Sequence, residues 1–214
     1  MSEHTHDHGH DHDHPHPNQP DIDSEPMGYY QLMGSALGEL LIEKGVITAD
    51  ELRAAIENVD SRSPEGGAKV VAKAWTDPEY KARLLENGTA AVDELGIDMP
   101  ATHLVVVENT DKVHNVIVCT LCSCYPRMLL GLPPDWYKAH AYRSRVVREP
   151  RAVLKEFGTE LADDVEIRVH DSTADMRYLV LPRRPDGTEG MSEEGLVELV
   201  SRDCMIGVTL PRSS

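Results

Sequence analysis

The sequence lacks any apolar stretch near the roughly 20 residues that a transmembrane helix needs. Its first residues also lack the basic and apolar regions of a secretory signal. Basic residues are few: 21 Lys and Arg face 37 Asp and Glu, which gives a formal net charge of −16. Nucleic-acid binding depends on clustered basic side chains, and 5% aromatic content offers few platforms for stacking bases. We therefore expect a cytoplasmic protein that binds neither nucleic acid nor membrane.

Cysteine is also scarce, but its placement is uneven. Three of the four cysteines, Cys119, Cys122 and Cys124, fall within six residues. A disulfide framework spreads its cysteines to join distant segments, so this pattern does not suit one. Clustered thiols in a chain expected to be cytoplasmic predict metal or redox chemistry instead.

The N-terminal segment has almost nothing apolar to bury. Residues 4–16 contain seven histidines interleaved with aspartate, and residues 1–26 contain no Lys or Arg. This composition predicts a disordered tail over residues 1–26. Alternating imidazoles and carboxylates could collect divalent metal ions, or the tail could be a solvated leader with adventitious affinity.

A helical pattern begins after this tail. Apolar residues recur at three- and four-residue spacing from Tyr29 to Leu41, and Gly45 is a stop signal. Thr48 and Glu51 have the spacing of a capping box that opens a second helix. These two helices predict an arm over residues 27–66. Further short helices are expected over 68–75, from 76–79 to 87–88, and over 89–95.

The second half of the chain favours strands as well as helices. β-Branched runs at 104–107 and 116–118 flank a loop at 109–112, which predicts a hairpin. Further strands are expected at 165–169, 177–181 and 205–208, with helices at 135–147, 150–157 and 192–201. The chain is therefore predicted to be α+β, with the helical arm followed by one domain over residues 67–214.

The cysteine cluster has too few thiols for the common metal sites. Structural zinc and iron–sulfur clusters usually take four protein ligands. The nearest candidates for a fourth ligand are His114, five residues before Cys119, and Cys204, 80 residues after Cys124. Three readings stay open: a zinc site completed by one of these residues, a chance cluster of thiols, or an unusual metal site with an open position.

The residues around the cysteines carry a family resemblance. The run over residues 118–126 resembles the metal-binding signature of the nitrile hydratase alpha subunit. The likeness continues through residues 67–80, 130–138, 142–147, 184–190 and 201–208, and covers roughly residues 27–210. The resemblance implies a layered α-β-β-α metal-binding domain of the nitrile hydratase alpha type.

The resemblance also implies a ligand set. The sulfurs of Cys119, Cys122 and Cys124 would hold the metal with the backbone amide nitrogens of Ser123 and Cys124, which leaves a sixth position for water or substrate. Cys122 would be oxidised to sulfinate and Cys124 to sulfenate, and both are the expected catalytic residues. The attacking oxygen would come from the Cys124 sulfenate or from a hydroxide on the metal.

Two neighbours of the cysteines point to the kind of metal. Thr120 and Tyr125 resemble the cobalt members of the family, so one Co(III) per chain is expected rather than iron. Implied partners are a beta-type subunit, as one chain or split into two, a cobalt-insertion or activator protein, and a small nitrile substrate. The helical arm would wrap the beta-type subunit.

Three positions depart from the common nitrile hydratase pattern. Arg127 and Met191 stand where tryptophan is usual, and Cys204 stands where serine is usual. Arg127 and Cys204 are similar to the gamma subunit of thiocyanate hydrolase, as is the tail rich in His and Asp. With Tyr125, Arg127 is a candidate for the substrate pocket, where it would favour an anionic or polar substrate. It could instead pair with an acid of the partner subunit.

Three functions therefore stand as hypotheses. The first is hydration of a nitrile at a cobalt centre, and the second is hydrolysis of thiocyanate at the same centre. The third is a non-catalytic metal-storage protein or metallochaperone, in which the histidine-rich tail would be the main metal-binding device.

Overall fold

The computed structural model describes residues 27–213. The chain divides into two compact units, one ending at Leu52 and the other beginning at Arg53. The predicted tail over residues 1–26 lies outside the described residues. The predicted boundaries of the arm, 27–66, and of the domain, 67–214, stay predictions.

The first helices form where the sequence signals place them. Helix α1 spans Tyr29–Glu43, and Gly45 follows it in the left-handed region at φ +64°. Helix α2 spans Ala49–Asp60. The capping box is confirmed, because the Glu51 N–H donates to Thr48 Oγ1 at 3.1 Å and the Thr48 N–H donates to Glu51 Oε2 at 2.7 Å. Neither helix contains a buried residue, and α1 exposes six large apolar side chains: Tyr29, Tyr30, Leu32, Met33, Leu37 and Leu40.

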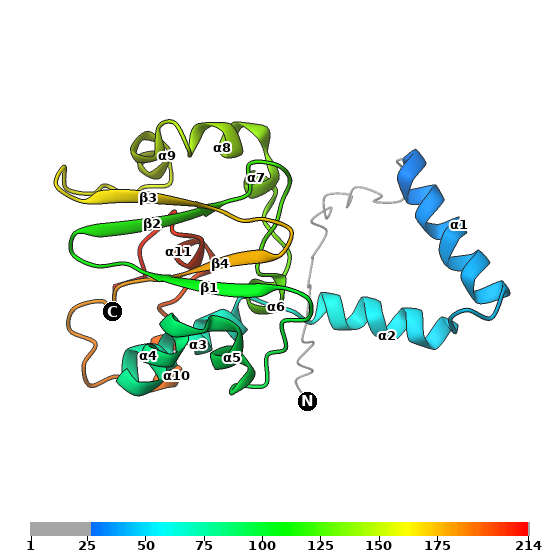
Figure 1. The fold of residues 1–214 in the computed structure, drawn as a ribbon, viewed down its shortest axis with the longest axis horizontal. Coiled ribbons are helices and arrows are strands. Elements are labelled where there is room, and N and C mark those ends of the chain that lie inside the picture. The colour runs from blue at the N-terminus through cyan, green and yellow to red at the C-terminus, as the bar shows by residue number, and fades with distance from the viewer. Residues whose placement is uncertain (1–26, 214) are drawn as a thin grey trace, which may run out of the picture. The chain divides into compact units, whose positions relative to one another are not determined.

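The second unit is built around two small parallel sheets. Strands β1 (His103–Glu108) and β4 (Met176–Leu181) form one sheet. Strands β2 (Val113–Val118) and β3 (Glu166–Asp171) form the other. Figure 1 shows the two sheets as successive layers with helices on both outer sides. This arrangement confirms the α+β class and the α-β-β-α layering that the resemblance implied.

The helices fall into groups around the sheets (Figure 1). On the side of β2 and β3 lie α7 (Asp135–Lys138), α8 (His140–Arg145) and α9 (Pro150–Glu156). On the side of β1 and β4 lie α3 (Glu65–Thr76), α4 (Pro78–Glu86), α5 (Gly88–Asp93) and α10 (Glu193–Val197). Helix α11 (Arg202–Ile206) contacts α3, β2 and β4, and the short α6 (Arg127–Leu130) contacts α3.

The hairpin predicted for residues 104–118 is wrong. Its loop does turn, since the Thr110 N–H donates to the Val113 carbonyl at 2.9 Å. However, β1 and β2 enter different sheets, and each pairs in parallel with a strand more than 50 residues away, such as Val118 with Asp171. Five of the six residues of β2 are buried, as suits a parallel strand that is covered on both faces.

Two further predictions about secondary structure are corrected. Residues 205–208 do not form a strand, because Ser201 Oγ accepts from the Cys204 N–H at 3.2 Å and so caps helix α11. The helix predicted over 135–147 is broken at Ala139, whose ψ of 135° separates α7 from α8. Ser192 does cap α10, but that helix ends at Val197.

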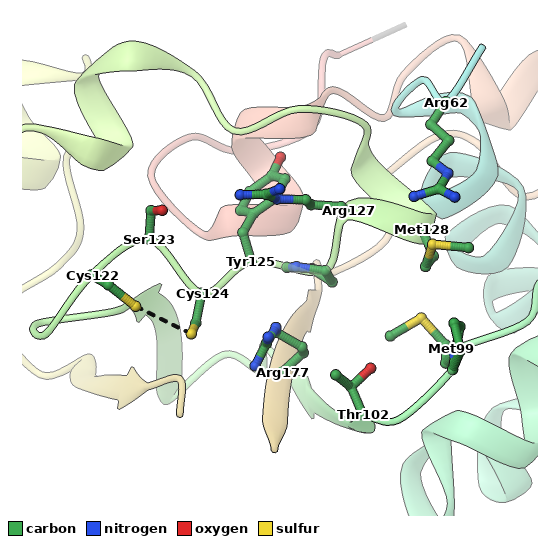
Figure 2. A pocket seen from close by; sticks show the side chains of 12 residues that line it. Arg62, Met99, Thr102, Cys122, Ser123, Cys124, Tyr125, Arg127, Met128 and Arg177 are labelled. Atoms are coloured by element: carbon green, nitrogen blue, oxygen red, sulfur yellow. Dashed lines mark hydrogen bonds between the residues drawn. The ribbon is translucent and has the colours of Figure 1, made fainter. Parts of the chain in front are cut away.

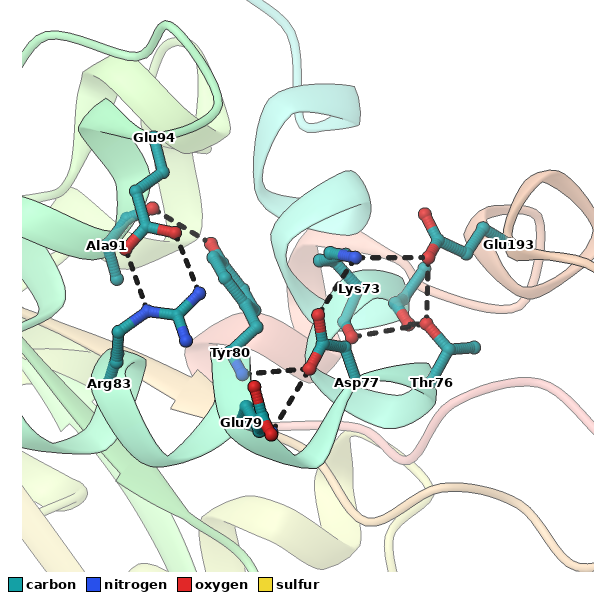
Figure 3. A network of polar contacts seen from close by, with 10 residues as sticks. Lys73, Thr76, Asp77, Glu79, Tyr80, Arg83, Ala91, Glu94 and Glu193 are labelled. Atoms are coloured by element: carbon teal, nitrogen blue, oxygen red, sulfur yellow. Dashed lines mark hydrogen bonds and ion pairs between the residues drawn. The ribbon is translucent and has the colours of Figure 1, made fainter.

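Polar contacts fix the outer helix layer (Figure 3). Asp77 Oδ1 accepts from the N–H groups of Glu79 and Tyr80 at 3.1 and 3.0 Å, which caps α4, while Lys73 pairs with Asp77 at 3.0 Å. Arg83 forms a two-bond pair with Glu94 that joins α4 to the end of α5. Within residues 27–213, no helix is long and apolar enough to cross a membrane.

Gly207 is a point where only glycine fits. It ends α11 at φ +92°, and a Cβ there would lie 2.0 Å from the carbonyl oxygen of Asn115 in β2. The Gly207 carbonyl accepts from buried His114 Nε2 at 2.8 Å, so the backbone is held on both sides.

We predict that Gly207→Ala destabilises the chain by about 2–6 kcal/mol, because left-handed strain and overpacking each cost about 1–3 kcal/mol. Urea unfolding measures the change. Gly190→Ala is the control, since a Cβ there meets nothing within 4 Å, and it should move stability by under about 0.5 kcal/mol. Equal effects of the two substitutions would contradict the packing described for Gly207.

Candidate metal centre

The three clustered cysteines lie on the loop that leaves β2. Cys119 directly follows the buried end of the strand and is itself buried, whereas Cys124 is half-buried and Cys122 is exposed. The Cys122 sulfur lies 3.4 Å from each of the other two sulfurs, and all three lie within 4.8 Å of one another. The loop therefore directs all three sulfurs toward one point.

The first part of this loop is held by the neighbouring strand. Asp171 ends β3 and lies opposite Val118, and its carboxylate accepts from the Thr120 N–H at 2.9 Å and from Thr120 Oγ1 at 2.5 Å. Arg143 Nη1 donates to the Thr120 carbonyl at 3.2 Å. Both backbone polar groups of Thr120 are therefore bound by side chains, which fixes the bend between Cys119 and Cys122.

Aromatic side chains hold the loop from the α7–α9 layer. Tyr137 donates its hydroxyl to the Cys124 carbonyl at 2.9 Å, and Tyr142 donates to the Ile117 carbonyl at 2.8 Å. These rings belong to a cluster that contains five of the ten aromatic residues of the chain: Tyr125, Trp136, Tyr137, Tyr142 and Phe157. Packed rings with hydroxyls bound to backbone carbonyls give the thiol loop a rigid support.

The surroundings of the three thiols differ. Hydrogen bonds from Cys119 and Cys124 and from the backbone amides of Ser123 and Cys124 lower the pKa of Cys122 to about 7. Burial raises the pKa of Cys124 to about 12, against the opposing effect of the nearby Arg177 guanidinium. In the metal-free chain, Cys122 therefore ionises at a much lower pH than Cys124.

The donor set fits a metal ion bound by sulfur and nitrogen. Three soft sulfurs meet at one point. The N–H groups of Ser123 and Cys124 face the Cys122 sulfur, and within the described chain neither donates to a backbone carbonyl. These two amide nitrogens are thus near the sulfurs and free of secondary structure, as the ligand set implied by the resemblance requires.

The zinc alternative that used a fourth side chain is wrong. Within residues 27–213, the only group of at least three potential metal-binding side chains close enough to share an ion is Cys119, Cys122 and Cys124. His114 is engaged elsewhere, with Asn109 at Nδ1 and the Gly207 carbonyl at Nε2. Cys204 is buried in α11 and donates to the Ser201 carbonyl at 3.0 Å.

A pocket of about 400 Å³ opens beside the thiols. Tyr125 and Arg127, the residues predicted to line a substrate pocket, both lie on its wall. Figure 2 shows Cys122 and Cys124 at one side of this pocket, with Arg62 and Met128 at the other. Sequence reasoning missed the five lining residues that come from other segments: Arg62, Met99, Pro100, Thr102 and Arg177.

Comparison with known families decides the identity of this fold and site. Residues 29–209 match the family described as nitrile hydratase, alpha chain. The chain belongs to the nitrile hydratase alpha-chain family. Alpha subunits of this family work in nitrile hydratase together with a beta subunit.

Relatives in the family include cobalt proteins. The chain is 57% identical to a nitrile hydratase alpha subunit of a Rhodococcus species, over 81% of this chain and 88% of that one. It is 56% identical to the cobalt-containing nitrile hydratase alpha subunit of Pseudonocardia thermophila, over 81% and 86%. It is also 44% identical to the thiocyanate hydrolase gamma subunit of Thiobacillus thioparus, over 88% and 82%.

Solved structures agree with this assignment. A recombinant thiocyanate hydrolase with partially modified cobalt centres has a TM-score of 0.81 and 42% identity, over 87% of this chain and 92% of that one. A variant of an Fe-type nitrile hydratase from Comamonas testosteroni Ni1 has a TM-score of 0.79 and 48% identity, over 85% and 90%. A thiocyanate hydrolase with cobalt centres and an Fe-type nitrile hydratase therefore contain chains with this fold.

The different thiol environments predict an order of alkylation in the metal-free chain. Iodoacetamide attacks thiolates, so exposed Cys122 should react first, with its rate rising through about pH 7. Cys124 and buried Cys204 should react at least about tenfold more slowly at neutral pH, because burial raises the pKa of each. Mass spectrometry of peptides over a pH series measures the order. Faster labelling of Cys124 than of Cys122 would contradict the geometry.

Proposed function

We propose that the chain is the metal-bearing alpha subunit of a cobalt nitrile hydratase, which converts a small organic nitrile to its amide. The convergence of the Cys119, Cys122 and Cys124 sulfurs on one point, in a chain of this family, carries the proposal. In the reaction the oxygen of water becomes the carbonyl oxygen on the nitrile carbon, the C–N triple bond becomes a single bond, and the two protons of water end on nitrogen. No electrons are transferred, so no redox partner is needed.

Sulfur and amide nitrogen are the proposed ligands. Cys119, Cys122 and Cys124 would bind through sulfur, and Ser123 and Cys124 through their amide nitrogens, to one Co(III) per chain. That ion would supply the Lewis acidity that makes the nitrile carbon electrophilic. The cobalt-containing relatives support cobalt over iron.

The residues of the chain would orient the reaction. Cys122 and Cys124 are the proposed catalytic residues, as sulfinate and sulfenate respectively. Tyr137 and Asp171 hold the backbone on either side of these two sulfurs, so their directions are set before substrate arrives. Arg177 lies close enough to Cys124 to favour its anionic form.

The exposed apolar side chains of α1 and α2 favour the presence of a partner subunit. Helices α1 and α2 bury none of their residues, and isolated helices of this length are marginal in water. Their exposed apolar side chains therefore require a covering surface. We propose that a beta-type subunit supplies it, that an activator protein inserts cobalt, and that the enzyme acts in the cytoplasm.

Thiocyanate hydrolysis is the second candidate. It is favoured by Arg127, which lies on the pocket wall and suits an anion, and by the related thiocyanate hydrolase gamma subunit. An assay of amide release from nitriles beside carbonyl sulfide release from thiocyanate separates the two. The metal-storage hypothesis rested on residues 4–16, outside the described residues, and the family match supports the enzyme instead.

Removing single thiols tests the ligand set. Cys122→Ser and Cys124→Ser should each lower nitrile hydration by more than about 100-fold and reduce bound cobalt, because a hard hydroxyl replaces a soft sulfur. Metal analysis and amide release measure the effects. Cys204→Ser is the matched control and should keep both, since Cys204 lies outside the cluster. Full cobalt content in either cluster variant would refute the assignment.

Co-expression tests the partner. The chain produced together with a beta-type subunit should elute with it as one complex during size-exclusion chromatography. Deleting residues 27–52 should weaken that complex by at least about tenfold, because it removes most of the exposed apolar side chains described above. A monodisperse monomer in the presence of the beta-type subunit would overturn the proposal of a partner.

A further inference from the structure

Three arginines and no carboxylate residue line the pocket beside the thiols. Arg62, Arg127 and Arg177 reach it from three different segments, and no Asp or Glu is among the lining residues. The whole chain carries a net charge of −16. The arginine side chains therefore bring positive charge to this pocket, although the chain as a whole is strongly negative.

These arginines are also short of carboxylate partners. Five other arginines of the described chain form ion pairs with acids, as Arg83 does with Glu94 and Arg145 with Glu156. In residues 27–213 no ion pair involves Arg62, Arg127 or Arg177. Arg177 donates to main-chain carbonyls of its own turn, and Arg62 Nη2 donates to Asn58 Oδ1 at 2.6 Å. Their positive charges are left available to a ligand.

The three arginines do not occupy the same place. Arg177 lies near Cys124, where its charge favours the anionic sulfur. Arg62 lies at the far side of the pocket from the thiols, and Arg127 lies between them in the view of Figure 2. The nearby sulfurs therefore account for the presence of Arg177 in the pocket, but they do not account for Arg62.

The position of Arg62 is fixed by packing. Gly131, just after α6, has φ +71°, and a Cβ there would lie 2.6 Å from the Arg62 carbonyl oxygen. The backbone of Arg62 therefore rests directly against the segment that carries Arg127. Such close packing fixes the position of the Arg62 Cα, which lowers the entropy cost of binding a ligand through its side chain.

The space between the thiols and Arg62 suits a molecule longer than a triatomic ion. Met99 and Met128 line the pocket on the side of Arg62 and offer flexible apolar contacts. A volume of about 400 Å³ compares with about 30 Å³ for one water molecule, and it lies in the range of small-molecule sites. Thiocyanate at the thiols would leave most of this volume, and Arg62, unused.

We propose that the pocket selects nitriles that carry an anionic group at the end opposite the nitrile, such as a short cyanocarboxylate. The nitrile points to Cys122 and Cys124, the methylene groups lie along Met99 and Met128, and Arg62 binds the carboxylate with Arg127 nearby. This inference rests on the proposed nitrile hydration and adds its substrate class. The reaction is the same addition of water, and the product is the amide of the same carboxylate.

The test uses the complex of the chain with its beta-type partner. The kcat/KM for cyanopropionate is compared with that for cyanopropionamide, its uncharged counterpart, in the wild type and in Arg62→Gln, Arg62→Lys and Arg148→Gln. The wild type should prefer the anion by at least about tenfold, because one charge-assisted hydrogen bond contributes about 1.5–3 kcal/mol. Arg62→Gln should remove the preference through KM, and Arg62→Lys should restore part of it.

Arg148→Gln is the matched control. It removes the same charge from an exposed residue that is not on the pocket wall, and it should keep the wild-type preference. A second readout does not depend on turnover: calorimetric titration with succinamate, the product of cyanopropionate, should give a Kd at least about tenfold weaker in Arg62→Gln than in Arg148→Gln.

The outcomes separate this inference from the proposed function. Hydration of both compounds with equal kcat/KM, or equal loss of preference in Arg62→Gln and Arg148→Gln, would overturn the anionic substrate class and leave nitrile hydration intact. If neither nitrile is hydrated, the proposed function fails, and the succinamate titration still decides whether Arg62 binds an anion. Unchanged succinamate binding in Arg62→Gln would sink the inference on its own.

Discussion

Three cysteine sulfurs lie within 4.8 Å of one another, and contacts from β3, α7 and α8 hold the loop that carries them. As thiolates they would repel each other strongly, so they need a cation among them. The chain fixes the loop beforehand: Asp171 and Arg143 bind Thr120, and Tyr137 binds the Cys124 carbonyl. The positions of the three sulfurs therefore depend on β3, which lies beside β2, and on the aromatic cluster, which lies beside the loop.

Local signals in the sequence predicted local structure well. The Thr48–Glu51 capping box, the Gly45 stop and the Ser192 cap all appear as expected, because each depends on neighbours within a few residues. Strand partners could not be predicted in this way. The turn at 109–112 is real, but β1 and β2 enter different layers, since burial of β2 decides its partner. The strand predicted at 205–208 does not form, because Ser201 caps helix α11 and Gly207 ends it after Ile206.

The residues of the candidate site were likewise only partly predictable from the sequence. The three cysteines and the neighbouring Tyr125 and Arg127 were found from sequence because they are contiguous on one loop. Arg62 precedes α3, and Arg177 lies on β4, so only the fold brings them to the same pocket. No local pattern marked either residue. The six-residue cysteine loop thus forms one wall of a pocket whose other walls come from distant segments. Those distant residues are the ones that we propose select the substrate.

We propose that sulfur and backbone nitrogen of one loop hold a trivalent cobalt ion. Cobalt K-edge X-ray absorption of the purified complex tests it most directly, because the edge position reports the oxidation state and the fine structure reports the ligand atoms. We expect low-spin Co(III) with three sulfur and two nitrogen scatterers from the protein. Divalent cobalt surrounded only by imidazole nitrogen and carboxylate oxygen would contradict it.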